Sequence, residues 1–124
     1  MRIKYMFLKR NIEIKMHSDN SFINVYALYK CREVGRIACG IDERAKLVMV
    51  GDITCKRKNR GYGSLMMEKL IEFAKANNFR EIKGWLSCVD RGHEKRLYHF
   101  YQKFGFKIVP HDEGIKFADI KLSL

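Results

Sequence analysis

The first half of the chain alternates apolar and polar residues with the period of two that is typical of half-buried strands. Ile12, Ile14 and Met16, for example, are each separated by one charged residue. This pattern predicts strands over residues 12–17, 22–30, 33–41 and 47–53, with a turn at Asp19-Asn20. The last of these segments is an almost continuous apolar run, which predicts a strand covered on both faces.

The hydrophobic period becomes helical after residue 60. Apolar side chains between Tyr62 and Ala74 form one stripe, and a second stripe from Leu97 to Phe104 follows the i, i+3, i+4, i+7 spacing. Helices are therefore predicted over residues 61–78 and 94–104, and further strands over 82–89, 106–109 and 117–122. This order predicts an α/β (α+β) domain. Its mixed sheet begins as an antiparallel meander and contains a parallel, right-handed strand-helix-strand unit over 47–89.

Length and composition limit the class of protein. The chain has 124 residues, of which 47% are hydrophobic, and it contains no apolar run of the roughly 18 residues that a membrane helix needs. We therefore expect one globular domain over residues 1–124 and no membrane association. The four cysteines and four histidines are scattered, without a Cys-x-x-Cys pair. This spacing predicts free thiols, a cytoplasmic location and no metal site.

The charge points to phosphate-bearing partners. Lys and Arg number 25 against 14 Asp and Glu, which gives a net charge of +11, and the densest basic cluster spans residues 56–60. Such a surplus attracts nucleic acid, anionic lipid or a phosphorylated cofactor. A basic nucleic-acid-binding module is one alternative, with five tyrosines available for base stacking: Tyr26, Tyr29, Tyr62, Tyr98 and Tyr101. No helix-turn-helix, zinc-finger or aromatic RNA-binding signature supports that alternative.

Residues 53–64 contain the most informative segment of the chain. A buried strand leads into a basic loop with Gly61 and Gly63, and a helix begins at once. Helix N-termini expose unpaired N–H groups with partial positive charge, and glycine lets a ligand approach the backbone closely. The segment therefore favours an anion site, most naturally for a pyrophosphate. Taken alone it also fits a glycine turn with a solvated basic loop, and it matches neither the Walker loop nor the dinucleotide fingerprint.

Two motifs resemble those of the GNAT N-acetyltransferase superfamily. Lys58-x-x-Gly61-x-Gly63 is similar to its Arg/Gln-x-x-Gly-x-Gly/Ala signature, and the run from Tyr101 to Phe106 is similar to its Tyr-x-Lys-x-Gly-Phe ending of the last helix. The resemblance extends from about residue 46 to residue 109. The departures are Lys58 at the first signature position, Glu94 where an Asn often stands, and Leu97 in place of a common Ala.

The resemblance implies a largely antiparallel GNAT sheet with a splayed central strand pair and two main helices. Family members usually place one or two helices between their first two strands, where they wall the acceptor site. Only His17 to Ser21 separates the corresponding strands here, so those helices are expected to be reduced or absent. The acceptor face is then expected to be open, or to be walled by a second copy of the chain in a homodimer.

The resemblance also implies acetyl-CoA as cosubstrate and a primary amine as acceptor, with direct attack in a ternary complex. The backbone of Ile53 and Cys55 would contact the pantetheine arm, with Glu94 and Leu97 beside it, and an N–H near Ile53 would stabilise the oxyanion. The loop and first helical turn would hold the pyrophosphate, through Lys58, Asn59, Arg60, Gly61, Tyr62, Gly63 and Ser64. Tyr101 would protonate the leaving CoA thiolate, although its place on the apolar stripe also fits a core aromatic.

The general base is not identified by the resemblance. The glutamate that some family members use would align with Leu47, which cannot accept a proton. Asp52, Asp90, His93 and Glu94 are candidates acting through water, and each also fits a solvated surface position. Because no base stands out, a non-catalytic CoA-binding regulator of the same fold is a further alternative.

Overall fold

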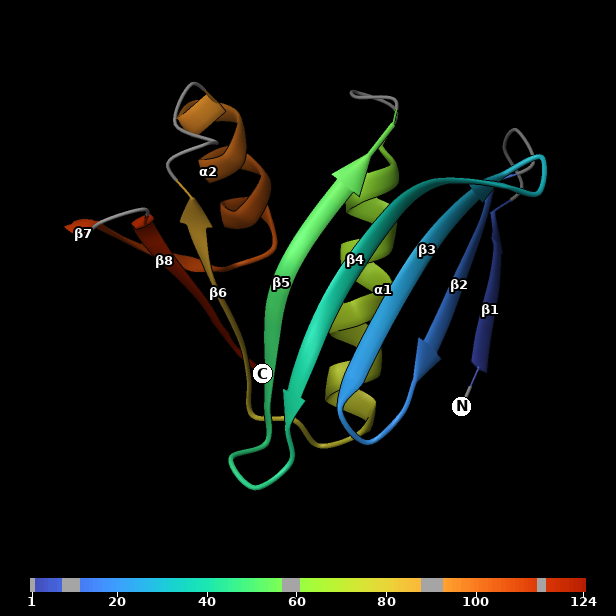
Figure 1. Ribbon diagram of the computed structural model, residues 1–124, viewed down its shortest axis with the longest axis horizontal. Helices are drawn as coiled ribbons and strands as arrows, with labels where there is room; N and C mark the ends of the chain where they lie inside the picture. The colour runs from blue at the N-terminus through green and yellow to red at the C-terminus, as the bar shows by residue number, and fades with distance from the viewer. Residues whose placement is uncertain (1, 8–11, 57–60, 88–92, 114–115) are drawn as a thin grey trace.

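The computed structural model describes residues 2–7, 12–56, 61–87, 93–113 and 116–124. In this part of the chain, eight strands form one sheet in the order β1-β2-β3-β4-β5-β6-β8-β7 (Figure 1). The strands are β1 (Arg2–Phe7), β2 (Ile12–Ser18), β3 (Phe22–Tyr29), β4 (Arg32–Asp42), β5 (Leu47–Cys55), β6 (Glu81–Ser87), β7 (Lys107–Glu113) and β8 (Lys116–Ser123), and the helices are α1 (Tyr62–Ala76) and α2 (Glu94–Lys103). β5 and β6 pair in parallel, and the other neighbouring strands pair antiparallel. The predicted mixed, largely antiparallel sheet is confirmed.

Local signals set the connections and the helix ends. The Asp19 carboxylate accepts hydrogen bonds from the N–H groups of Ser21 and Phe22, both at 2.8 Å. These bonds hold the pKa of Asp19 below its usual value and close the predicted turn between β2 and β3. Asn78 and Gly105 follow α1 and α2 with φ of 62° and 93°, the left-handed conformation that ends helices. The short β2–β3 connection leaves no room for the helices that the family usually carries there.

The structure adds one strand that was not predicted and corrects one prediction. β1 was not predicted, although Ile3, Tyr5 and Phe7 occupy alternate positions and carry the strand signal. The expectation that β5 is covered on both faces is wrong. Val48 and Val50 are buried, whereas the Met49 side chain between them is 38% exposed. An apolar run cannot reveal whether a second layer covers its other face, and here no described helix does so.

The core lies between α1 and one face of the sheet. Residues such as Ile14, Val25 and Ile37 on that face are fully buried, as are Met66 and other apolar side chains of α1. Figure 1 shows α1 behind β3 and β4, while no described helix lies in front of these strands. The opposite side of β2–β5, which we call the open face, is therefore the side without a helical layer in the described part of the chain. None of the described helices is long and apolar enough to cross a membrane.

Close packing of α1 favours glycine at position 35. A β-carbon added there would lie 2.9 Å from Met66 Cε and 3.2 Å from the carbonyl oxygen of Thr54. We expect Gly35→Val to lower the free energy of unfolding by about 1–3 kcal/mol, because the extra methyl groups overfill a packed core. Urea denaturation followed by circular dichroism measures this change. Gly40→Val is the matched control, since no described neighbour lies within 4 Å of its added β-carbon. Equal stabilities for the two variants would contradict the packing argument.

Candidate functional site

β5 and β6 separate after a short parallel ladder. Their pairs run only from Leu47↔Glu81 to Met49↔Lys83, although both strands continue further. Figure 1 shows the two arrows diverging beyond this point. A β-bulge lies where they part, because Val50 and Asp52 face consecutive residues of β4 and leave Gly51 without a partner in the ladder. Bulges bend and twist a strand, which explains the divergence. The predicted splay of the central strands is thus confirmed.

The divergence leaves backbone groups of β5 pointing away from its antiparallel neighbour. The Lys56 N–H donates to the Val34 carbonyl oxygen at 2.8 Å. Antiparallel pairs alternate between exchanging hydrogen bonds and pointing their groups outward. Because Lys56 bonds to β4, Ile53 and Cys55, at odd spacing from it, belong to the pairs whose groups point outward. Their N–H and C=O groups therefore point away from β4, toward the side from which β6 has diverged. These are the two residues predicted to contact a pantetheine arm.

The N-terminus of α1 lies just beyond this end of β5. Gly61 is its N-cap residue with φ of 78°, a left-handed conformation that glycine adopts without strain. Among the described residues no side chain caps the helix, and its first turn holds no acidic residue. The first turn therefore supplies no carboxylate to offset the positive end of the helix, as expected for a site that receives an anion. The predicted residues Lys58, Asn59 and Arg60 lie outside the described residues.

Gly63 is the point where three elements meet. A β-carbon added to it would lie 3.3 Å from Cε1 of Phe100 in α2 and 3.9 Å from Sγ of Cys55 in β5. The absence of a side chain therefore lets both helices approach the end of β5. Three predicted residues, Cys55, Gly61 and Gly63, are brought together here, while Tyr62 is buried in the core below them.

Lys103 joins the same region and was not among the predicted site residues. Its ammonium donates to Oγ of Ser64, in the first turn of α1, at 2.5 Å. The same nitrogen lies 5.4 Å from the ring centroids of Phe100 and Phe104. The signal for it was present in the Tyr-x-Lys motif, but its spatial partner is 39 residues away in the chain. A cation beside the α1 N-terminus adds to the attraction for an anion.

α2 carries the remaining predicted side chains. Tyr101 is buried, with 5% exposure, and its ring packs edge-on against Phe100 and Phe106 at centroid distances of 5.2 and 5.3 Å. This confirms its place in the core and fixes the ring orientation. Glu94 and Leu97 are half-buried near the start of the helix. Their roles toward a ligand, and that of Tyr101 as an acid, stay predictions.

The base candidates fall in different places. Asp52 is exposed on the open face of β5, immediately before Ile53, and His93 is exposed at the start of α2. Asp90 lies outside the described residues, as does Cys88. Among the described thiols, burial raises the pKa of Cys39 to about 12, so this thiol is not a nucleophile near neutral pH.

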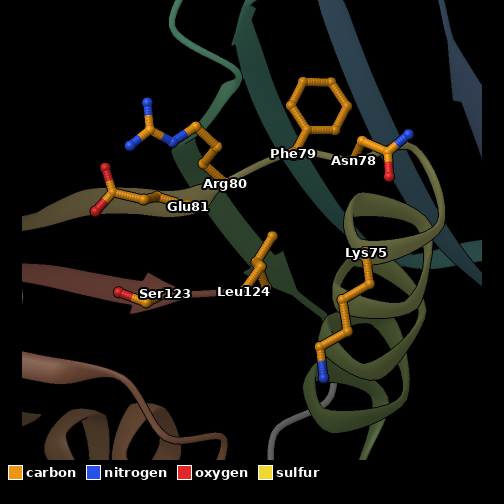
Figure 2. A pocket seen from close by; sticks show the side chains of 7 residues that line it. All are labelled: Lys75, Asn78, Phe79, Arg80, Glu81, Ser123 and Leu124. Carbon is orange, nitrogen blue, oxygen red and sulfur yellow. The ribbon is translucent and has the colours of Figure 1, made fainter.

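A shallow pocket of about 580 Å³ lies elsewhere, at the opposite end of α1. Figure 2 shows its lining, which includes Lys75, Phe79, Glu81 and Leu124. It contains none of the predicted site residues. The candidate site is therefore defined by the backbone at the end of β5 and by the α1 N-terminus, and not by this pocket.

Comparison with known proteins identifies the family. The model of the acetyltransferase (GNAT) family matches residues 17–106, which include β3 to α2 and both motifs. The chain belongs to the GNAT acetyltransferase family. The uncharacterized protein YocC of Bacillus subtilis is 35% identical over 77 residues, which are 59% of this chain and 46% of that protein. The chain thus spans about half the length of this relative.

Solved structures agree on the fold. The PaiA N-acetyltransferase of Thermoplasma acidophilum, in complex with coenzyme A, has a TM-score of 0.69 at 17% identity, over 84% of this chain and 62% of that one. A Bacillus anthracis protein in complex with acetyl coenzyme A has a TM-score of 0.68 at 20% identity, over 86% and 65%. The Escherichia coli ribosomal-protein-S18-alanine N-acetyltransferase has a TM-score of 0.70 at 11% identity, over 99% and 94%. At these identities the likeness concerns the fold alone.

Proposed function

We propose that this protein is an acetyl-CoA-dependent N-acetyltransferase that transfers an acetyl group to a primary amine by direct attack in a ternary complex. Membership of the acetyltransferase family over residues 17–106 carries this proposal. Two structural relatives were solved with coenzyme A or acetyl coenzyme A, which supports acetyl-CoA as the cosubstrate. The divergence of β5 from β6 and the glycine turn at the α1 N-terminus agree with it.

The direction of the backbone supports the proposed roles of Ile53 and Cys55. Ile53 and Cys55 would exchange hydrogen bonds with the amides of the pantetheine arm, as a neighbouring strand would. The N–H groups of residues 61–64 would hold the pyrophosphate, joined by Lys103 and, from the sequence motif, by Lys58, Asn59 and Arg60. Glu94 and Leu97 would flank the arm from α2.

The chemistry needs little beyond positioning. The acceptor amine, once neutral, attacks the thioester carbonyl carbon. A C–N bond forms and the C–S bond breaks as the tetrahedral intermediate collapses. An N–H near Ile53 stabilises the developing oxyanion, and holding both substrates together supplies much of the rate. The thiolate leaves with a proton from the Tyr101 hydroxyl, and the proton lost by the amine passes to a carboxylate or water.

We expect acetyl-CoA to raise the melting temperature, because a ligand bound only by the native state stabilises it. At about 100 times the dissociation constant the gain is about 2.7 kcal/mol, or roughly 10 °C for a domain of this size. Differential scanning fluorimetry measures the shift. An amine panel with detection of the released CoA thiol then measures turnover.

The same experiment separates the alternatives. A shift with nucleic acid alone, lost at high salt, would favour a nucleic-acid-binding module. A shift with acetyl-CoA but no thiol release for any amine would favour a non-catalytic CoA-binding protein. No shift with acetyl-CoA would remove the proposed function.

A further inference from the structure

The open face presents ordered rows of side chains beside the proposed reaction centre. Lys15, Tyr26 and Arg36 each lie between core-facing neighbours on their strands, so they point away from α1. Cross-strand pairing aligns them in one row that ends at Thr54 of β5. The adjacent row ends at Asp52.

Acetyl-CoA and the acceptor would reach β5 from opposite sides. Cys55 faces α1, because its Sγ lies 3.9 Å from a β-carbon added to Gly63. Asp52 instead pairs with Ala38, whose strand neighbours Ile37 and Cys39 are buried on the α1 side. Side chains alternate along a strand, so Asp52 lies on the open face. This face is therefore where an acceptor amine can meet the thioester without displacing the cosubstrate.

Arg36 is held in place on this face by two contacts. Its guanidinium carbon lies 5.0 Å from the ring centroid of Tyr26, and Nη2 donates to Oε1 of Glu33 at 3.1 Å. Arg36 is nevertheless 46% exposed, so this ion pair contributes little to stability. The outcome is an oriented guanidinium that still reaches solvent. Such a planar fork suits an anionic oxygen pair.

Arg36 and Asp52 are diagonal neighbours on adjacent strands, since Arg36 pairs with Thr54. Diagonal neighbours lie about 7–8 Å apart between α-carbons. The small Ala38 lies opposite Asp52 and is the next residue after Arg36 on the same face of its strand. A carboxylate and a guanidinium thus lie on the same face of adjacent strands, beside Ile53.

We propose that the open face binds an acceptor that carries both a primary amine and an anionic group several bonds away. The amine would lie at Asp52, which would accept its proton, and the anionic group at Arg36. Free ω-amino acids and acidic peptide N-termini share this chemistry. The net charge of +11 would draw such acceptors toward the protein. This inference rests on the proposed acetyltransferase function.

Matched acceptor pairs test it. β-Alanine is compared with β-alaninamide, and a peptide amide beginning Asp-Ala-Ala with one beginning Asn-Ala-Ala, by thiol release. We expect the acidic member of at least one pair to have the higher kcat/KM. The pair that shows this preference distinguishes a small amino acid from a peptide terminus. Arg36→Gln should raise KM for that acidic member roughly 10–100-fold and leave its amide partner unchanged, because a charge-assisted hydrogen bond is lost.

Glu33→Gln is the matched control. It removes the intramolecular partner of Arg36, so KM for the acidic acceptor should stay the same or fall, while Arg36→Gln raises it. Melting temperatures of both variants should match the wild type. Equal use of acid and amide, an equal effect of Arg36→Gln on both, or an acetyl-CoA shift without acetylation of any panel member would overturn this inference. If acetyl-CoA does not raise the melting temperature of the wild type, that result would instead overturn the proposed function on which this inference rests.

Discussion

Tyr101→Phe is expected to lower kcat by roughly 10²–10⁴-fold, the usual loss when a positioned acid is removed. The phenylalanine ring keeps the edge-on packing against Phe100 and Phe106, so the cosubstrate site should be preserved. KM for acetyl-CoA should therefore change little. Steady-state kinetics with thiol detection measure both parameters.

Tyr98→Phe is the control for this prediction, because Tyr98 is half-buried on the same helix. It should retain most of the wild-type turnover. The acetyl-CoA melting shift should be present in both variants, which separates a lost proton donor from a lost fold. Unchanged turnover of Tyr101→Phe at every pH tested would remove the acid role and leave Tyr101 as a core aromatic.

Gly63→Trp is expected to abolish the acetyl-CoA melting shift of roughly 10 °C. An indole at this position would collide with Phe100 and fill the space above the end of β5, because even a β-carbon lies 3.3 Å from Phe100 Cε1. Gly40→Trp is the matched control, since no atom of the described residues lies within 4 Å of a β-carbon there. That variant should keep the shift.

Ser64→Glu tests the same site without disturbing the packing. A carboxylate in the first turn of α1 favours the helix and can still accept the hydrogen bond from Lys103. The variant should therefore melt at or above the wild-type temperature without ligand. It should lose the acetyl-CoA shift, because the new charge repels the pyrophosphate. A full shift in Ser64→Glu would show that the phosphates do not bind at the α1 N-terminus.

Elements that depend on neighbours in the sequence were predictable. The apolar stripe over Leu97 to Phe104 predicts α2. The turn at Asp19 forms because its carboxylate accepts hydrogen bonds from the backbone N–H groups two and three residues later. Asn78 and Gly105 end the helices because both residue types adopt the left-handed conformation readily, and this preference is a property of the residue itself. The strand β1 had the right alternation and could have been predicted on the same basis.

Features that depend on a second layer were not predictable. The apolar run from Leu47 to Val50 predicts a strand that is covered on both faces. Met49 is nevertheless partly exposed, because the described chain places no helix on the open face. The link between Lys103 and Ser64 spans 39 residues, so no local pattern contains it. Spacing likewise cannot show that Arg36 and Asp52 share one face, because that depends on strand register.

The sequence by itself determined the helices, most strands, the family and the glycine turn that begins α1. These depend on hydrophobic period, turn chemistry and motif spacing, which act over a few residues. The resemblance implied that the central strands splay, but only the tertiary structure decided that β5 leaves β6 after Met49, that the backbone groups of Ile53 and Cys55 point outward, and which face is open. The physical reason is that pairing partners and burial are set by segments distant in the chain, and the bulge at Gly51 acts only through its neighbour β4.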